Sequence, residues 1–370
     1  MSGSPSTLTV PHRILMGPGP SDTPPEVLRA LSLPTLGHLD PAFLGIMDEV
    51  KEMLRTVFLT DNEFAIPISG TGSAGMETAL VNMIEPGDRV IVCVSGVFGR
   101  RMCDIVERCG GVLKQIEVEW GTPVDPEVVA RAFEEFSAQV LCIVHAETST
   151  GVLQPMEEIS AITKSHQALL VMDAVTSLGG APVRTDEWSV DVCYSGTQKC
   201  LSCPPGLAPI TFSSRALDKL RSRSHRVPSW YLDMTMVEKY WGPERVYHHT
   251  APINMIYALR EALRLAIEEG LEARWERHRA LHSELVAGIE ALGLEMLVEK
   301  PYRAPMLNAV RVPDGVDEAL LRRRLLEEYE IEIGSGLGPL KGKIWRVGLM
   351  GYSCKRENVS LFLDALKKLL

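Results

Sequence analysis

Two stretches of the chain decide its fold class: Ala168-Leu169-Leu170-Val171-Met172-Asp173 and Val190-Asp191-Val192-Cys193-Tyr194-Ser195-Gly196-Thr197-Gln198-Lys199. Each begins with a short apolar run that is typical of a buried strand, and each ends in polar residues. The separation of Asp173 and Lys199 is about that of one strand–helix–strand unit. We therefore expect their charged side chains to emerge side by side from the ends of neighbouring parallel strands.

This pair of residue types indicates cofactor chemistry. Burial lowers the pKa of a lysine and makes its amine nucleophilic. A lysine that bonds the cofactor aldehyde, with an aspartate on the pyridinium nitrogen, is what proteins contribute to pyridoxal phosphate chemistry. Taken singly, Asp173 could cap a helix and Lys199 could be a solvated loop residue. The pair, combined with the phosphate-type loop described below, favours the cofactor interpretation.

Composition restricts the class of protein. The 370 residues are 45% hydrophobic and 23% charged, which is ordinary for a globular protein. The formal net charge of −10 disfavours nucleic acid and anionic membranes as partners. The eight cysteines are scattered and suggest no disulfide framework, and no apolar run is long enough to span a membrane. Met1–Arg13 lacks a signal-peptide core, so we expect a cytoplasmic protein.

Short apolar runs alternate with helix-period segments between about residues 64 and 215. This order predicts an α/β fold with a largely parallel, seven-stranded sheet covered by helices on both faces. The expected strands are Phe64–Ser69, Arg89–Val94, Val112–Val118, Val140–His145, Ala168–Asp173, Val190–Ser195 and Leu207–Phe212.

The alternation of strand-like and helix-like segments ends after about residue 215. Residues 221–250 look irregular, and a helix is then expected over Pro252–Glu269, with Gly270 as its stop. A second helix over Glu272–Leu292 leads into a strand–strand–helix–strand–strand–helix tail. We expect an N-terminal segment (1–22), a large domain (23–270) and a smaller α+β domain (271–370).

The run Gly70-Thr71-Gly72-Ser73-Ala74-Gly75 matches G-x-G-x-x-G between an expected strand and helix. A dinucleotide site would also need an acidic residue at the end of the second strand, but Arg89–Val94 is followed by Ser95-Gly96. The loop therefore fits a single phosphate, held by amides at the helix N-terminus and by the hydroxyls of Thr71 and Ser73.

Further motifs occur in order along the chain between about residues 13 and 368. They are Gly17-Pro18-Gly19-Pro20, Ser69–Ser73, Glu147-Thr148-Ser149-Thr150-Gly151, Asp173-Ala174-Val175-Thr176-Ser177-Leu178-Gly179-Gly180, Ser195–Lys199, Tyr247-His248-His249-Thr250, Ile331-Glu332-Ile333 and Arg346-Val347-Gly348. Together these motifs resemble the class V pyridoxal-phosphate aminotransferases, and within them the alanine–glyoxylate and serine–pyruvate branch.

The resemblance implies fold-type I (aspartate aminotransferase-like) and pyridoxal 5'-phosphate as cofactor. It makes Lys199 and Asp173 the catalytic residues and Gly19, His38 and Arg346 substrate-binding residues. No metal ligand is implied. The implied cofactor-binding residues are Thr71, Gly72, Ser73, Phe98, Thr148, Asp173, Val175, Gln198, Lys199, Tyr247 and Thr250.

The resemblance also implies an activity and an assembly. The amino group of alanine or serine would pass to glyoxylate or pyruvate in ping-pong half-reactions, with Lys199 as Schiff-base lysine and proton shuttle. Ureidoglycine–glyoxylate and aminoethylphosphonate transaminases remain open alternatives. Tyr247 and Thr250 match positions that reach the site of a partner subunit, which implies a homodimer with active sites at the interface.

Three other interpretations fit parts of the sequence. His145-Ala146-Glu147 with Cys200-Leu201-Ser202-Cys203 has the outline of a zinc deaminase, but Lys199 stands where a proline is expected. Redox sensing by Cys200 beside a cationic lysine is conceivable. A non-catalytic member of the fold would have no need for Asp173 and Lys199.

Arg346 interrupts the short apolar strand Lys343-Ile344-Trp345-Arg346-Val347-Gly348. Such an arginine either pairs with a structural acid, sits on an exposed face, or projects into the cleft between domains. Its planar guanidinium can hold an α-carboxylate with two parallel hydrogen bonds.

Overall fold

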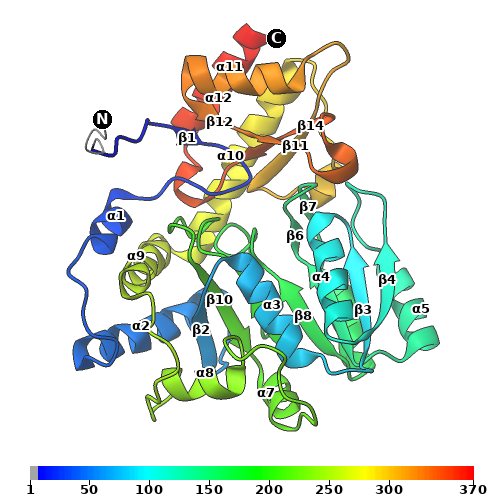
Figure 1. Ribbon diagram of the computed structural model, residues 1–370. Coiled ribbons are helices and arrows are strands. Elements are labelled where there is room, and N and C mark those ends of the chain that lie inside the picture. Colours follow the sequence, from blue (N-terminus) through cyan, green and yellow to red (C-terminus); the bar gives the residue numbers. More distant parts are fainter. Residues whose placement is uncertain (1–6) are drawn as a thin grey trace, which may run out of the picture.

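A seven-stranded sheet forms the centre of the computed structural model, which describes residues 7–370 (Figure 1). Its strand order is β2-β10-β9-β8-β5-β3-β4, and β10 runs antiparallel to both neighbours while the other pairs are parallel. The predicted number of strands and the mostly parallel sheet are confirmed. The strands are β2 (Phe64–Ser69), β3 (Arg89–Val94), β4 (Val112–Glu117), β5 (Val140–Val144), β8 (Leu169–Asp173), β9 (Val192–Tyr194) and β10 (Leu207–Phe212).

Amphipathic helices pack against this sheet and bury their apolar sides in one large core. Several begin where the sequence provides a cap: the Asp40 carboxylate accepts the amide of Ala42, and Asp125 accepts that of Glu127. A proline follows each of these caps at the first helical position. The helices are α1 (Pro25–Leu31), α2 (Pro41–Phe58), α3 (Gly72–Met83), α4 (Val97–Arg108), α5 (Pro126–Phe136), α6 (Glu157–Ser165), α7 (Ser214–Arg221), α8 (Met234–Trp241) and α9 (Ile253–Glu269).

The connection between β8 and β9 differs from the prediction. We expected a helix between Asp173 and Lys199, but residues 174–191 form turns and bends. The two strands are nevertheless parallel neighbours, and Asp173 lies beside Tyr194 in their register. The carboxyl ends of both strands therefore meet at one edge of the sheet, as the prediction required.

A second core lies in the C-terminal part of the chain. It is built on a three-stranded antiparallel sheet and includes Met16 from the N-terminal segment. There β1 (Ile14–Leu15) pairs in parallel with β12 (Ile331–Glu332). The other elements of this part are α10 (Leu271–Ala291), β11 (Leu307–Arg311), α11 (Glu318–Tyr329), β13 (Gly334–Ser335), β14 (Ile344–Gly348) and α12 (Arg356–Leu369).

The predicted order of this tail is wrong in detail. After α10 the chain forms strand–helix–strand–strand–strand–helix, because the first expected strand is reduced to a single bridge between Met296 and Val310. The packing of Met16 and β1 brings the predicted N-terminal segment next to this second core, although residues 1–6 of that segment lie outside the described residues. The domain boundaries remain a prediction.

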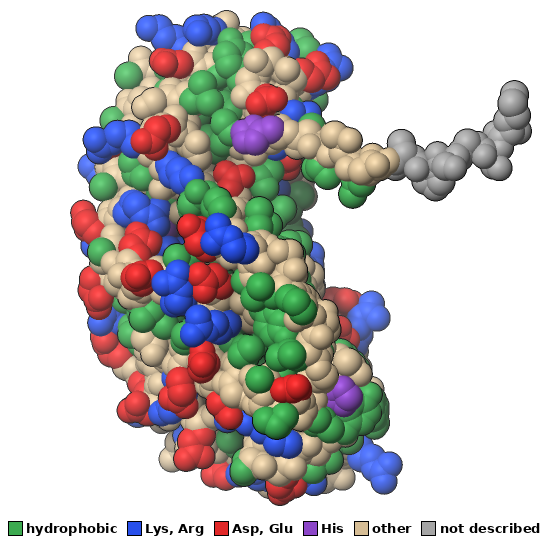
Figure 2. All heavy atoms as spheres, turned by 90° about the vertical axis from the view of Figure 1, so that its left-hand side faces the viewer, with side chains coloured by type: hydrophobic (Ala, Val, Ile, Leu, Met, Phe, Trp, Pro, Cys, Tyr) green, Lys and Arg blue, Asp and Glu red, His purple; other side chains and the backbone are tan. Residues whose placement is uncertain are grey.

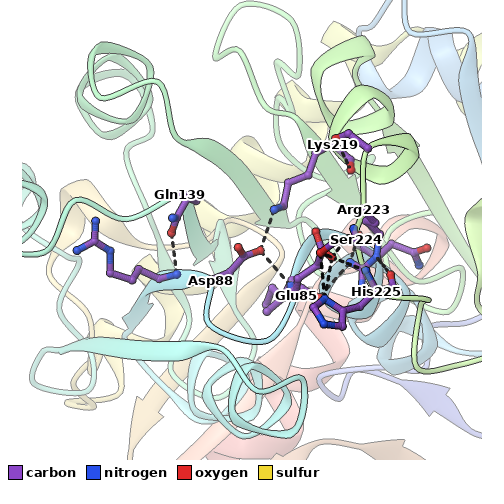
Figure 3. A network of polar contacts seen from close by, with 11 residues as sticks. Glu85, Asp88, Gln139, Lys219, Arg223, Ser224 and His225 are labelled. Carbon is purple, nitrogen blue, oxygen red and sulfur yellow. Dashed lines mark hydrogen bonds and ion pairs between the residues drawn. The ribbon is translucent and has the colours of Figure 1, made fainter.

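The segment 221–250 is more ordered than its composition suggested, since it contains α8. A polar network fixes its beginning to the C-terminal end of α3 (Figure 3). Arg223 donates to the carbonyls of Asn82 and Ile84. Although burial opposes ionisation, amide donation from His225 and contacts with Ser224 lower the pKa of Glu85 to about 2. The charged carboxylate thus anchors this segment to the large core.

Five short elements connect the others. A hairpin of β6 (Ala146–Glu147) and β7 (Val152–Leu153) follows β5. Single 3-10 turns cover Lys300–Tyr302, Gly338–Leu340 and Gly351–Ser353. Within residues 7–370, no helix combines the length and the apolar character needed to cross a bilayer.

Candidate active site

A cavity of about 120 Å³ lies at the carboxyl edge of the large sheet. Eight of the eleven residues predicted to bind the cofactor line this cavity, and both predicted catalytic residues are among them. Met76 of α3 lines it as well and was not predicted. The lining residues are Thr71, Gly72, Ser73, Met76, Phe98, Asp173, Val175, Gln198 and Lys199.

Asp173 ends β8 inside the protein and is only 2% exposed. Its two carboxylate oxygens accept hydrogen bonds from the amide of Val175 (2.8 Å) and the hydroxyl of Tyr194 (2.9 Å). Burial raises its pKa to about 7, against the effect of these donors. A positive charge placed in the cavity would favour the ionised carboxylate, so the site suits a protonated ring nitrogen. Asp173 does not cap a helix.

Lys199 follows β9 and is buried rather than solvated, which excludes the loop-lysine interpretation. Burial lowers its pKa to about 8, and the nearby charge of Arg346 acts in the same direction. The N-terminal segment covers it: Nζ donates to the carbonyl of Pro18, and the Ser21 hydroxyl donates to the Lys199 carbonyl at 2.8 Å. A Cβ on Gly19 would lie 2.5 Å from Nζ. The amine therefore has little room to move, and its pKa lies close to neutral pH.

The glycine loop opens α3 at Gly72. Its N-cap residue Thr71 makes no side-chain capping bond, and the first amides of a helix lack partners within the helix. A Cβ at position 72 would lie only 3.0 Å from the Val175 side chain, so a glycine allows the loop to pack this close to Val175. The side-chain oxygen of Gln198 is buried without a hydrogen-bond partner in the described chain. This cradle fits a phosphate.

Glu147 positions the aromatic residue of the cavity and was not predicted to do so. Its carboxylate accepts from the Ser149 amide (3.0 Å) and lies 3.5 Å from the Phe98 amide at the start of α4. Burial raises its pKa, and its other oxygen is buried without a partner within residues 7–370. A carboxylate at a helix N-terminus is favourable. Glu147 thus fixes the turn of α4 that carries Phe98.

Arg346 lies in β14 and is buried beside the cavity. Its Nε donates to the Ser335 carbonyl (2.7 Å) and its Nη1 to the Thr148 carbonyl (3.0 Å). Burial lowers its pKa to about 10, while the charge of Glu147 acts in the opposite direction. The exposed-face interpretation is therefore wrong. Thr148 itself hydrogen-bonds Thr176 and stands behind the cavity lining.

His38, Tyr247 and Thr250 lie away from the cavity of their own chain. The rings of His38 and Tyr247 are 5.1 Å apart, and Tyr247 is 57% exposed. The Tyr247 hydroxyl lies 3.4 Å from that of Thr250, which is also exposed. The described chain brings these three predicted residues together with one another, not with Lys199.

The competing constellations have no support in the geometry. Among residues 7–370, no group of three or more His, Cys, Asp and Glu side chains is arranged to hold a metal. Cys200 is fully buried, and burial raises the pKa of its thiol to about 12. A buried thiol with a raised pKa is poorly reactive, so the geometry does not support redox sensing by Cys200. His145 instead contacts Ser177 at 2.9 Å.

A larger cavity of about 400 Å³ lies between α9, α10 and the turn at Gly351, and Leu201 and Ser202 also line it. Its charged side chains already pair with one another, Glu269 with Arg274 and Arg277. It contains no unpaired buried polar side chain among its lining residues in the described chain. The smaller cavity, with its unpaired Gln198 oxygen and its buried Asp–Lys pair, is the better candidate for catalysis.

Comparison with known proteins matches this arrangement to a family. The family model "Aminotransferase class-V" matches residues 14–361. The chain belongs to the class V aminotransferases. It is 43% identical to the (S)-ureidoglycine–glyoxylate transaminase of Bacillus subtilis, with 98% of this chain and 92% of the relative covered. It is 41% identical to the alanine–glyoxylate aminotransferase of Callithrix jacchus, with 98% and 89% covered.

A solved structure agrees with this assignment. The alanine–glyoxylate aminotransferase of a Nostoc species superposes with a TM-score of 0.98 at 49% identity, covering 99% of this aminotransferase and 97% of that chain. The predicted family, fold-type I architecture and pyridoxal phosphate cofactor are confirmed. The protein is therefore an enzyme that transfers amino groups with the help of pyridoxal phosphate.

Two supporting residues escaped prediction although the sequence held a signal for each. Tyr194 ends the strand beside β8, so its contact with Asp173 follows from the parallel register. Glu147 begins the run Glu147-Thr148-Ser149-Thr150-Gly151, but one of its partner amides, that of Phe98, comes from α4. Only the tertiary fold brings these elements together.

Proposed function

We propose that this aminotransferase moves the amino group of a small amino acid, alanine or serine, to glyoxylate or pyruvate by ping-pong half-reactions. The observation that carries the proposal is Arg346. Its guanidinium is fixed through Nε and Nη1 by backbone carbonyls, and Nη2 has no hydrogen bond within residues 7–370. An α-carboxylate is the group that such a guanidinium recognises, and every one of these substrates carries one.

Different residues in and around the cavity would hold different parts of the cofactor. Thr71, Gly72, Ser73 and Gln198 would hold the cofactor phosphate, and Phe98 and Val175 its ring faces. Thr148, behind the lining beside Thr176, would hydrogen-bond near the ring hydroxyl. When bound, pyridoxal phosphate supplies an electron sink for the bond that is broken at the substrate α-carbon. Asp173 would keep a proton on the ring nitrogen, and Tyr194 and the Val175 amide hold its carboxylate in place.

Lys199 would hold the cofactor before substrate arrives and then carry the α-proton on Nζ. A pKa near 8 supports both roles, because at neutral to mildly alkaline pH a useful fraction of the amine is unprotonated. The cover formed by Pro18 and Gly19 limits the positions that Nζ can occupy. It also restricts the access of water to the amine.

Ureidoglycine is an equally supported amino donor, because a relative at 43% identity is named as a ureidoglycine–glyoxylate transaminase. Glyoxylate appears in the names of both relatives and is the acceptor we favour. Aminoethylphosphonate fits Arg346 less well, since it has no carboxylate. A panel of alanine, serine, (S)-ureidoglycine and aminoethylphosphonate against glyoxylate and pyruvate tests these proposals. Visible absorbance of the bound cofactor reports each half-reaction.

Lys199→Ala is the control in that panel and should abolish turnover while the protein remains folded. Turnover of aminoethylphosphonate alone would contradict the proposed substrate class. Conversion of no donor by a protein that binds the cofactor would favour the non-catalytic interpretation instead.

We further propose a homodimer in which Tyr247 and Thr250 complete the partner's phosphate site. Both side chains are exposed and lie away from their own cavity. Apolar side chains gather on the face over α1 and the segment that follows it (Figure 2). Leu28, Leu33 and Leu39 of this segment are 50%, 50% and 45% exposed. Such patches commonly mark interfaces. We propose the cytoplasm as the compartment, because all eight thiols are free.

A further inference from the structure

Arg101 touches two parts of the cofactor cavity although it does not line it. It lies on α4 three residues after Phe98, so both side chains share one face of the helix. Its Nη1 donates to the Ser73 hydroxyl at 3.0 Å, and its guanidinium carbon lies 4.9 Å from the centroid of the Phe98 ring. One cation therefore bridges the phosphate loop and the aromatic residue of the cavity.

The residues that line the cavity do not supply enough positive charge at the loop to balance a bound phosphate. A phosphate monoester carries between one and two negative charges at neutral pH. The lining residues supply two ionisable side chains, Asp173 and Lys199, of which Lys199 is committed to the cofactor aldehyde. The N-terminus of α3 offers a partial positive charge of about one half. No lining side chain thus provides a full positive charge at the loop.

The hydrogen-bond direction shows how Arg101 would act. A guanidinium only donates, so the Ser73 oxygen is the acceptor in this contact. The Ser73 hydroxyl proton is then free for a different acceptor, and the adjacent positive charge makes it a stronger donor. Ser73 lines the cavity, so an acceptor bound there is within its reach.

We propose that Arg101 is the cationic partner of the cofactor phosphate and acts through Ser73. This inference rests on the proposed position of the phosphate at Thr71, Gly72 and Ser73. Arg101 is in this sense a positioning residue: it orients the Ser73 hydroxyl, balances the phosphate charge and stacks on Phe98.

The test compares two compounds that differ only in the phosphate. Full-length apoprotein is titrated with pyridoxal phosphate and with pyridoxal, and binding is followed by absorbance. In Arg101→Gln, affinity for pyridoxal phosphate should fall about tenfold while affinity for pyridoxal stays the same. Arg101→Lys should recover part of the loss, because it keeps the charge without the fork. Added salt should weaken phosphate-dependent binding more in the unaltered protein than in Arg101→Gln.

Arg100→Gln is the matched control. Arg100 is the preceding residue of α4, but its Nε donates to Glu117 at 2.9 Å and it lies over Trp120. Its removal should leave the preference for pyridoxal phosphate over pyridoxal unchanged. An equal loss of both affinities in Arg101→Gln, or no loss of either, would overturn the inference. Equal affinities of the unaltered protein for the two compounds would contradict the phosphate site itself, and the inference with it.

Discussion

Replacement of Asp173 by asparagine should separate the stability of this aminotransferase from its activity. The two side chains have nearly the same shape, and asparagine can still accept the Val175 amide, so the sheet edge should keep its geometry. What is lost is the negative charge that would face the ring nitrogen of the cofactor in the proposed mechanism. Breaking a buried charge pair costs about 3–5 kcal/mol. We therefore expect kcat/KM to fall by roughly two to four orders of magnitude.

The stability of the apoprotein should change in the opposite direction. Burial raises the pKa of Asp173 from 3.8 to about 7, so the folded apoprotein disfavours the ionised form. A raised acid pKa means that stability is fully present below the unfolded pKa and is lost as the pH rises from about 4 to 7. This loss is on the order of 4 kcal/mol. Asparagine does not ionise and avoids it.

Thermal unfolding of the apoproteins between pH 4 and 8 measures this effect. The Tm of Asp173→Asn should exceed that of the unaltered protein by a margin that grows from pH 4 to 7 and is constant above. Asp191→Asn is the matched control for activity, since Asp191 is equally buried but binds Leu170 and Ser213 at the other end of β9. It should retain kcat/KM within about threefold. A margin that does not depend on pH, or a loss of activity below tenfold, would refute the reasoning.

Three further changes test neighbouring parts of the site. Arg346→Lys should raise KM for all amino and 2-oxo acid substrates by roughly tenfold or more and leave cofactor affinity intact, because an ammonium cannot reproduce the guanidinium fork; unchanged kinetics would make Arg346 structural. Gly19→Ala should displace Lys199 and abolish formation of the visible cofactor band, because the new Cβ would lie 2.5 Å from Nζ and the residue has a φ of +102°. Gly17→Ala is the control and should be neutral, because its Cβ would meet other atoms only at 3.8 Å. Tyr247→Ala should weaken cofactor binding in a dimer measured by light scattering, and a fully active monomer would contradict the proposed contribution from the partner.

The sequence alone determined the elements that depend on local pattern. Strands β2, β3 and β10 have the predicted bounds, because the apolar pattern that marks them lies within the strands themselves. The cavity was largely predictable for the same reason. Its loops follow strands that run in the same direction in one mostly parallel sheet, and the carboxyl ends of such strands meet at one edge.

Contacts between distant segments could be decided only by the tertiary structure. The chain crosses from β8 to β9 without the expected helix, and polar patterning cannot distinguish a long series of turns from a poorly marked helix. Likewise, α8 lies within a segment whose composition looks irregular, since packing and the anchor at Glu85 outweigh weak local preference.

The same division separates the two kinds of site residue. Asp173, Lys199 and the glycine loop could be predicted from the sequence as candidate site residues, because their chemistry follows from their own residue types and from the strands beside them. Arg101, Glu147 and the N-terminal cover at Pro18 contact partners that are far away in the chain. Their roles depend on distances of about 3 Å, which only the folded arrangement of sheet, helix and N-terminal segment sets, because a hydrogen bond requires its two groups to be brought together in space.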